Sequence, residues 1–143
     1  MDEHLRKSII LEHYENPLNK GLVEDEGYYK INMNSASCID NLDFMIKIED
    51  GIIKDARFDG EACAISTSAS SILTNMVIGK TKEEALDIIK NFEDMVGEAS
   101  YDEEVLGEAN AYCEIYKQAN RKKCALLPWW GIEKVIGDDN KDV

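Results

Sequence analysis

A change in hydrophobic period near residue 60 is the feature that most constrains the fold of this chain. From Leu42 to Ile48 apolar side chains occupy every second position, and the alternate positions, Asp43, Met45, Lys47 and Glu49, are expected to face away from the core. Asp50-Gly51 predicts a hairpin turn, after which Ile52, Ala56 and Phe58 should share the inner face, opposite Asp55 and Arg57. From Ile65 onward the apolar spacing becomes helical.

Helices are therefore predicted to dominate the second half. The apolar stripe from Ile65 to Val77 stops before Gly79, and Thr81 with Glu84 forms a capping box for a helix that Gly97 closes. The remaining expected elements are a helix over 5–14 ended by Asn16-Pro17, a strand over 28–33, a polar connection over 100–106, and helices over 108–119 and 126–136, the last with Pro128 in its first turn. Strands that come first and helices that follow predict an α+β fold, a small antiparallel sheet of about three strands covered by helices.

Size and charge narrow the possible functions. A chain of 143 residues, 44% hydrophobic, suits one domain over 1–143 with one core. Lysine and arginine number 16 against 29 acids, a net charge of −13, so a nucleic-acid partner is not expected. No apolar run approaches the roughly 20 residues that span a bilayer, and Met1-Asp2-Glu3-His4 lacks the order of a secretory signal. We expect a cytoplasmic protein with no membrane partner.

Three of the four cysteines precede or follow predicted elements. Cys38 lies in a small polar stretch with Asp40 two residues on, and Cys63 comes directly after the hairpin and before a helix. Cys124 follows Arg121-Lys122-Lys123 and is expected just before the last helix. A helix amino-terminus and nearby cations favour thiolate over thiol. In a reducing compartment such cysteines are better interpreted as thiols or metal ligands than as disulfides.

The alternative is that cysteines serve as small apolar core residues. This interpretation is favoured for Cys113, inside a helical pattern, and the absence of a CxxC pair makes the spacing evidence for a metal moderate. His4 and His13 receive no site, because surface or capping histidines are more common. The Ser/Thr run 66–71 lacks a phosphate-loop motif and is interpreted as helix capping. At least one ring of Trp129-Trp130 should pack in the core.

Four ordered motifs resemble the U-type iron–sulfur cluster scaffold family, which comprises IscU, SufU and the amino-terminal domain of NifU. They are His13-Tyr14-Glu15-Asn16-Pro17-Leu18-Asn19-Lys20-Gly21, similar to HYxNPRNxG; Cys38-Ile39-Asp40, similar to CGD; Asp55-Ala56-Arg57-Phe58, similar to DARF; and Gly60-Glu61-Ala62-Cys63-Ala64-Ile65-Ser66, similar to GxGCxIS. Lys123-Cys124-Ala125 matches the third ligand cysteine. The 61 positions from Cys63 to Cys124, Lys123 in place of histidine, and the absence of an LPPVK motif resemble the SufU branch.

The resemblance implies a SufE/NifU-like fold and a site formed by Cys38, Asp40, Cys63 and Cys124, supported by Arg121 and Lys123. Three thiolates and one carboxylate can close a tetrahedral zinc site or hold a [2Fe-2S] cluster. Ile39 and Ala62 replace glycines of the family motifs. If such a glycine has a positive φ, its replacement is expected to strain the backbone, and more so at Ile39, which is β-branched.

Three functions follow as alternatives. The first, implied by the SufU resemblance, is a zinc-dependent acceptor of persulfide sulfur from a SufS-like cysteine desulfurase, with Cys38 as the acceptor. The second is a scaffold that assembles a transient [2Fe-2S] cluster, or binds iron, and passes it to iron–sulfur assembly proteins or apo-acceptors. The third, from another class, is an acidic interaction module with a purely structural zinc site. The first and second functions differ in what the protein carries, which is persulfide sulfur or an iron–sulfur cluster. Only in the third does the metal serve to stabilise the fold.

Overall fold

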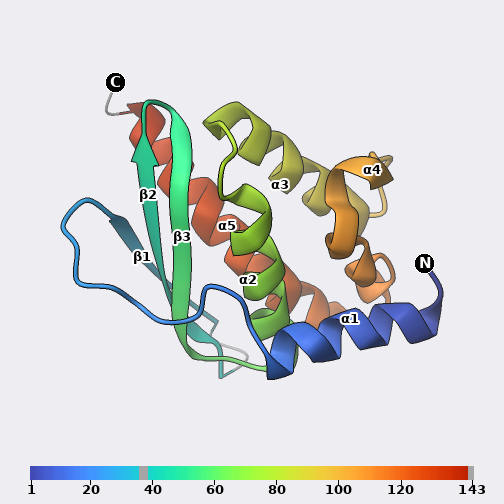
Figure 1. Cartoon of the computed structure of the whole chain (residues 1–143). Helices are drawn as coiled ribbons and strands as arrows, with labels where there is room; N and C mark the ends of the chain where they lie inside the picture. Colours follow the sequence, from blue (N-terminus) through green and yellow to red (C-terminus); the bar gives the residue numbers. More distant parts are fainter. Residues whose placement is uncertain (36–38, 142–143) are drawn as a thin grey trace.

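The computed structural model describes residues 1–35 and 39–141, with side chains to residue 137, and confirms the α+β prediction (Figure 1). Three antiparallel strands form one sheet in the order β1-β2-β3: β1 (Tyr29–Asn34), β2 (Asn41–Glu49) and β3 (Ile52–Glu61). The helices are α1 (Glu3–Glu15), α2 (Ala64–Val77), α3 (Lys82–Val96), α4 (Glu103–Leu106) and α5 (Ala119–Lys141), with the 3₁₀ turns η1 (Gly107–Tyr112) and η2 (Ile115–Lys117).

Helices α2 and α5 cover one face of the sheet, and α1 and α3 pack on their outer sides (Figure 1). Phe44 and Phe58 extend from the sheet into this layer with ring centroids 6.3 Å apart. Trp129 of α5 stacks on Phe92 of α3 at 3.9 Å, which confirms that one ring of the tryptophan pair packs in the core. The buried sheet face and the two inner helices thus form one continuous core.

The β2–β3 hairpin has a β-bulge that shifts which residues face the core. Ile48 pairs with Ile53 and Lys47 pairs with Asp55, so Lys54 is the extra residue on β3. The prediction that Ile52 shares the inner face with Ala56 is therefore wrong, and Ile53 is the buried residue. Met45, expected to face outward, is also buried, at 2% exposure. Leu22 and Val23 of the segment before β1 line a hollow with Met45 on that side of the sheet.

Two helical predictions need correction in the second half. The region predicted as a helix over 108–119 contains the two short 3₁₀ turns and the first residue of α5, and the expected polar connection contains α4. Helix α5 begins at Ala119, seven residues before the prediction, so buried Pro128 lies inside the helix rather than in its first turn. The predicted capping box at Thr81 and Glu84 is present at the start of α3.

Helix α1 is attached to the remainder of the molecule through a buried histidine. His13 Nδ1 lies 2.7 Å from the Ser71 hydroxyl of α2, and Nε2 lies 3.2 Å from a carboxylate oxygen of Glu108 in η1. The Ser71 hydroxyl also accepts the Leu18 amide at 2.8 Å. His13 is therefore an internal connector, and the expectation of a surface or capping role was wrong. Among the described residues, no helix has the length and apolar character needed to cross a membrane.

Candidate metal centre

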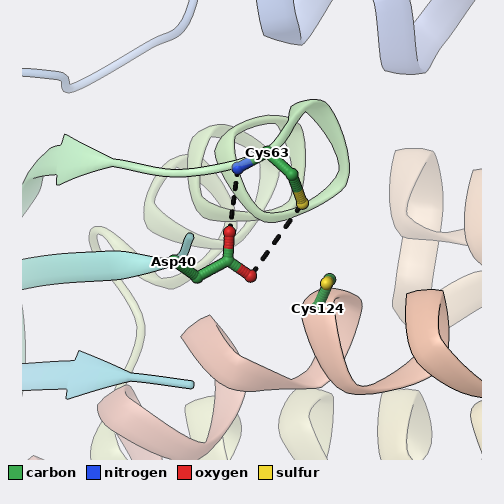
Figure 2. Close-up of side chains that lie close together, drawn as sticks. All are labelled: Asp40, Cys63 and Cys124. Atoms are coloured by element: carbon green, nitrogen blue, oxygen red, sulfur yellow. Dashed lines mark hydrogen bonds between the residues drawn. The ribbon is translucent and has the colours of Figure 1, made fainter. Parts of the chain in front are cut away.

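Asp40, Cys63 and Cys124 converge at one end of the sheet (Figure 2). One ligand atom from each of the three lies within 4.8 Å of the others. Asp40 immediately precedes β2, Cys63 precedes α2, and Cys124 lies in the second turn of α5. The sheet and its two covering helices thus each contribute one side chain to the same point.

Cys63 occupies the N-cap of α2, as its predicted place before a helix implied. Its backbone is extended, and its sulfur accepts the Ser66 amide at 3.4 Å. This sulfur therefore lies at the amino-terminal end of a helix, where a backbone amide is free to donate to it. Cys63 is also half-buried, so the sulfur is partly accessible.

The Asp40 carboxylate is buried, at 1% exposure, and fully engaged in hydrogen bonds. Its Oδ1 accepts the Cys63 amide at 2.8 Å, and its Oδ2 accepts the Ser66 hydroxyl at 2.7 Å. Burial acts to raise the pKa of Asp40, but these hydrogen bonds, with those from the two cysteine thiols, together hold the pKa below its usual value. The carboxylate is consequently kept in its charged, ligand-ready form.

Cys124 is buried inside α5 and not, as predicted, in front of it. The prediction that Cys124 lies at a helix amino-terminus is therefore wrong. Arg121 and Lys123, the expected supporting cations, are exposed in the first turn and a half of α5. The backbone carbonyl of Cys124 accepts the Ser66 hydroxyl at 2.8 Å, which ties α5 to the start of α2.

The donor set fits a tetrahedral, sulfur-preferring ion. Zinc binds thiolate at about 2.3 Å and carboxylate oxygen at about 2.0–2.2 Å, which places neighbouring donors of a tetrahedron about 3.5–3.8 Å apart. Cys63 Sγ and Asp40 Oδ2 lie 3.9 Å apart, close to that separation. Small side-chain movements would bring all three donors into the first shell of such an ion.

The remaining residues of interest lie around or outside this trio. Cys38, predicted as a ligand and as the sulfur acceptor, lies outside the described residues. Cys113 ends η1 and packs against the core, apart from the trio. Ile39 is 69% exposed beside the site. Ala62 has no positive φ, whereas Gly60 has φ +133° and a Cβ there would lie 2.2 Å from the Asn41 carbonyl oxygen.

Sequence reasoning missed Ser66. The Ser/Thr run was interpreted as helix capping, but α2 begins at Ala64 and Cys63 supplies the cap. Ser66 is instead fully buried, with its hydroxyl between Asp40 and Cys124. The spacing of Ser66, three residues after Cys63 on the helix, was a signal that could have placed it at the site.

Comparison with known proteins agrees with the fold and the motifs. The family model for the NifU-like N terminal domain matches residues 5–125. The zinc-dependent sulfurtransferase SufU of Bacillus subtilis (strain 168) is 36% identical over 94% of this chain and 91% of that protein. The iron–sulfur cluster assembly scaffold protein IscU of Streptococcus pyogenes serotype M1 is 34% identical over 93% of this chain and 83% of its own length.

Solved structures show the same likeness. A crystal structure described as a putative iron–sulfur cluster assembly scaffold protein for the SUF system, from Fervidobacterium islandicum AW-1, aligns with TM-score 0.78 and 30% identity over 92% of this chain and 97% of that one. A NifU-like N-terminal structure from Brucella abortus, at 20% identity, has the same fold with TM-score 0.82 over 99% of this chain and 100% of its own. With its motifs, fold and cysteine–aspartate trio in agreement, the chain belongs to the NifU-like N-terminal domain family.

Proposed function

We propose that this chain is a zinc-dependent acceptor of persulfide sulfur from a cysteine desulfurase and thereby supports iron–sulfur cluster assembly. The observation that carries the proposal is the convergence of Asp40, Cys63 and Cys124, with ligand atoms within 4.8 Å of one another. The 36% identity over 94% of the chain to a protein named a zinc-dependent sulfurtransferase supports the choice of cargo.

The composition of the site supports a carrier more than a structural clamp. In the proposal Cys38 is the fourth ligand, so three thiolates and one carboxylate around Zn²⁺ give the ion and its ligands a net charge of 2 − 4 = −2. A single oxygen among sulfurs is the weakest attachment for a sulfur-preferring ion. A structural zinc site more usually consists of cysteine and histidine in close-set pairs, and the trio here comes from positions 40, 63 and 124.

Cys38 is the proposed sulfur acceptor. A bound zinc ion keeps its thiol ligands deprotonated, which is the reactive form. The Cys38 thiolate attacks the outer sulfur of the desulfurase persulfide, a new S–S bond forms on Cys38, and the desulfurase cysteine leaves as a thiolate, so no external oxidant or reductant is needed. Cys63, fixed at the N-cap of α2, and Cys124, buried within α5, are the ligands expected to stay in place.

Charge supports the choice of partner. The net charge of −13 favours a desulfurase with a basic docking face, mainly through a faster encounter. Arg121 and Lys123 are exposed beside Cys124, and we propose that they offset part of the negative charge of the loaded site.

The second candidate is a scaffold that assembles a [2Fe-2S] cluster. It is favoured by the 34% identity over 93% of the chain to a protein named an IscU scaffold, and two thiols near one carboxylate also suit the outer valences of a cluster. In this case iron and sulfide are cargo, and the recipients are apo-acceptor proteins.

Elemental analysis and a sulfur-transfer assay separate the two candidates. Purification under nitrogen without affinity metals should yield about one zinc and no iron per chain. Brief reaction with a desulfurase and cysteine should then add 32 Da, roughly one sulfur atom, to the peptide that contains Cys38. Cys113→Ser is the matched control, expected to retain zinc and sulfur. Iron with acid-labile sulfide in the purified chain, or no added sulfur on any cysteine, would refute the sulfur-acceptor proposal.

A further inference from the structure

The Ser66 hydroxyl contacts both other segments of the metal centre from inside the protein. The hydroxyl oxygen lies 2.7 Å from Asp40 Oδ2 and 2.8 Å from the Cys124 carbonyl oxygen. The backbone amide of Ser66 donates to the Cys63 sulfur. Its side chain is fully buried. One serine therefore connects all three residues of the trio without being a ligand of the ion.

Pro128 removes the usual helical donor to the Cys124 carbonyl. In an α-helix the carbonyl of one residue accepts the amide of the residue four positions on, and for Cys124 that residue is Pro128, which has no N–H. Pro128 lies inside α5 and is buried. The Ser66 hydroxyl lies 2.8 Å from this carbonyl oxygen, which cannot accept a hydrogen bond from residue 128.

The hydroxyl has one hydrogen and two acceptors. Asp40 is a charged carboxylate and the stronger of the two, because charge-assisted hydrogen bonds exceed neutral ones. Oδ2, the oxygen bonded by Ser66, is also the oxygen 3.9 Å from the Cys63 sulfur. Ser66 thus orients the carboxylate oxygen that faces the thiol ligand.

We propose that Ser66 is a positioning residue for the metal centre, which orients Asp40 Oδ2 toward the ion. The inference rests on the proposed zinc site. Hydrogen-bond partners of metal-binding carboxylates commonly contribute 10- to 100-fold to metal affinity, so we expect Ser66→Ala to bind zinc at least about tenfold more weakly.

Ser70 provides a matched control one turn further along α2. It is also fully buried, and its hydroxyl donates to the Ser66 carbonyl at 2.8 Å, away from the trio. Ser70→Ala removes the same atom from the same helix, so a loss of packing or of helix stability alone would affect both variants. Zinc affinity measured by competition with a chromophoric chelator should change by less than about threefold in Ser70→Ala, because its partner is backbone rather than a ligand.

A double-mutant cycle tests the route through Asp40. If Ser66 acts by orienting this carboxylate, Ser66→Ala should weaken zinc binding by less than about threefold in an Asp40→Ala background. The absorption spectrum of bound Co²⁺ should also shift in Ser66→Ala in the direction of the Asp40→Ala spectrum. A tenfold loss that persists without Asp40, or a Co²⁺ spectrum identical to wild type, would overturn the proposal.

Pro128→Ala keeps the test valid if Ser66→Ala alone folds poorly. In a Pro128→Ala background the amide of residue 128 can donate to the Cys124 carbonyl. Replacing Ser66 in that background then removes mainly the hydrogen bond to the Asp40 carboxylate. Equal zinc affinity in Ser66→Ala and Ser70→Ala would refute the role of Ser66 and leave the proposed function standing. Tight zinc binding without sulfur acceptance would refute the function and leave Ser66 standing.

Discussion

Replacing Glu93 by glutamine should make the protein more stable at neutral and alkaline pH. Glu93 of α3 shares a hydrogen bond with Glu133 of α5, and both side chains are half-buried where these helices pack. Burial, followed by the hydrogen bond and the repulsion from Glu133, raises the pKa of Glu93 to about 7, and the Trp130 side chain opposes this by hydrogen bonding. Glu93 therefore retains its proton to a higher pH than an ordinary carboxyl group does.

The direction of the pH effect follows from proton uptake. With a folded pKa above the unfolded value, the folded state binds more protons between about pH 4.5 and 7, so the free energy of unfolding falls as pH rises through this window. A rise from 4.5 to about 7 corresponds to roughly 3 kcal/mol. Solvent screening of a half-buried pair reduces this to about 1–2 kcal/mol.

Urea unfolding of the metal-free protein at pH 5 and pH 8 measures this effect. Glu93→Gln should be about 1–2 kcal/mol more stable than wild type at pH 8 and about equal at pH 5, where the wild-type carboxyl is protonated. Asp87 is an exposed acid on the same helix, and Asp87→Asn is the control. It should change the free energy of unfolding by the same amount at pH 5 and at pH 8. A wild-type stability that does not fall between pH 5 and 8, or a Glu93→Gln variant less stable than wild type at pH 8, would refute the reasoning.

Three further substitutions test other parts of the molecule. His13→Ala should lower the free energy of unfolding by about 1–3 kcal/mol in urea, because it removes a buried imidazole and its hydrogen bond with the Ser71 hydroxyl, and a loss under about 0.5 kcal/mol would contradict this. Gly60→Ala should lower the melting temperature by several degrees, because its φ of +133° and the close Asn41 carbonyl exclude a Cβ; an unchanged melting curve would be inconsistent with that. Asp40→Ala should slow the decay in air of a reconstituted iron–sulfur cluster, followed by absorbance, because it removes the oxygen ligand; faster decay would oppose the idea.

The hydrophobic periods predicted the elements better than their details. The hairpin and its turn were predictable, but the β-bulge at Lys54 was not, because one extra residue leaves the local alternation almost unchanged while it exchanges Ile52 for Ile53 in the core. The start of α5 was misplaced because Pro128 was assigned to a first turn. A proline inside a helix removes one helical hydrogen bond, but here the Ser66 hydroxyl of α2 lies close to the carbonyl concerned. Local sequence rules do not include such a contact from another helix.

The candidate site was predictable at the level of residue types. The motifs around Asp40, Cys63 and Cys124 identified three side chains that the fold brings together. The role of the Ser66 hydroxyl between Asp40 and Cys124 was not predicted, because a serine near the start of a helix is usually interpreted as a cap. The local environment of Cys124 was also unpredictable, since it depends on how α5 packs against α2.

The wide spacing of the trio means that the proposed metal site is complete only after α5 has been synthesised. Asp40 and Cys63 are 63 − 40 = 23 positions apart, and Cys63 and Cys124 are 124 − 63 = 61 apart. When only the sheet and α2 have emerged from the ribosome, Asp40 and Cys63 are present, and Cys124 follows when α5 is synthesised. A copy without a folded α5 lacks the complete trio, so the proposed zinc binding requires that α5 has been synthesised and has packed against α2.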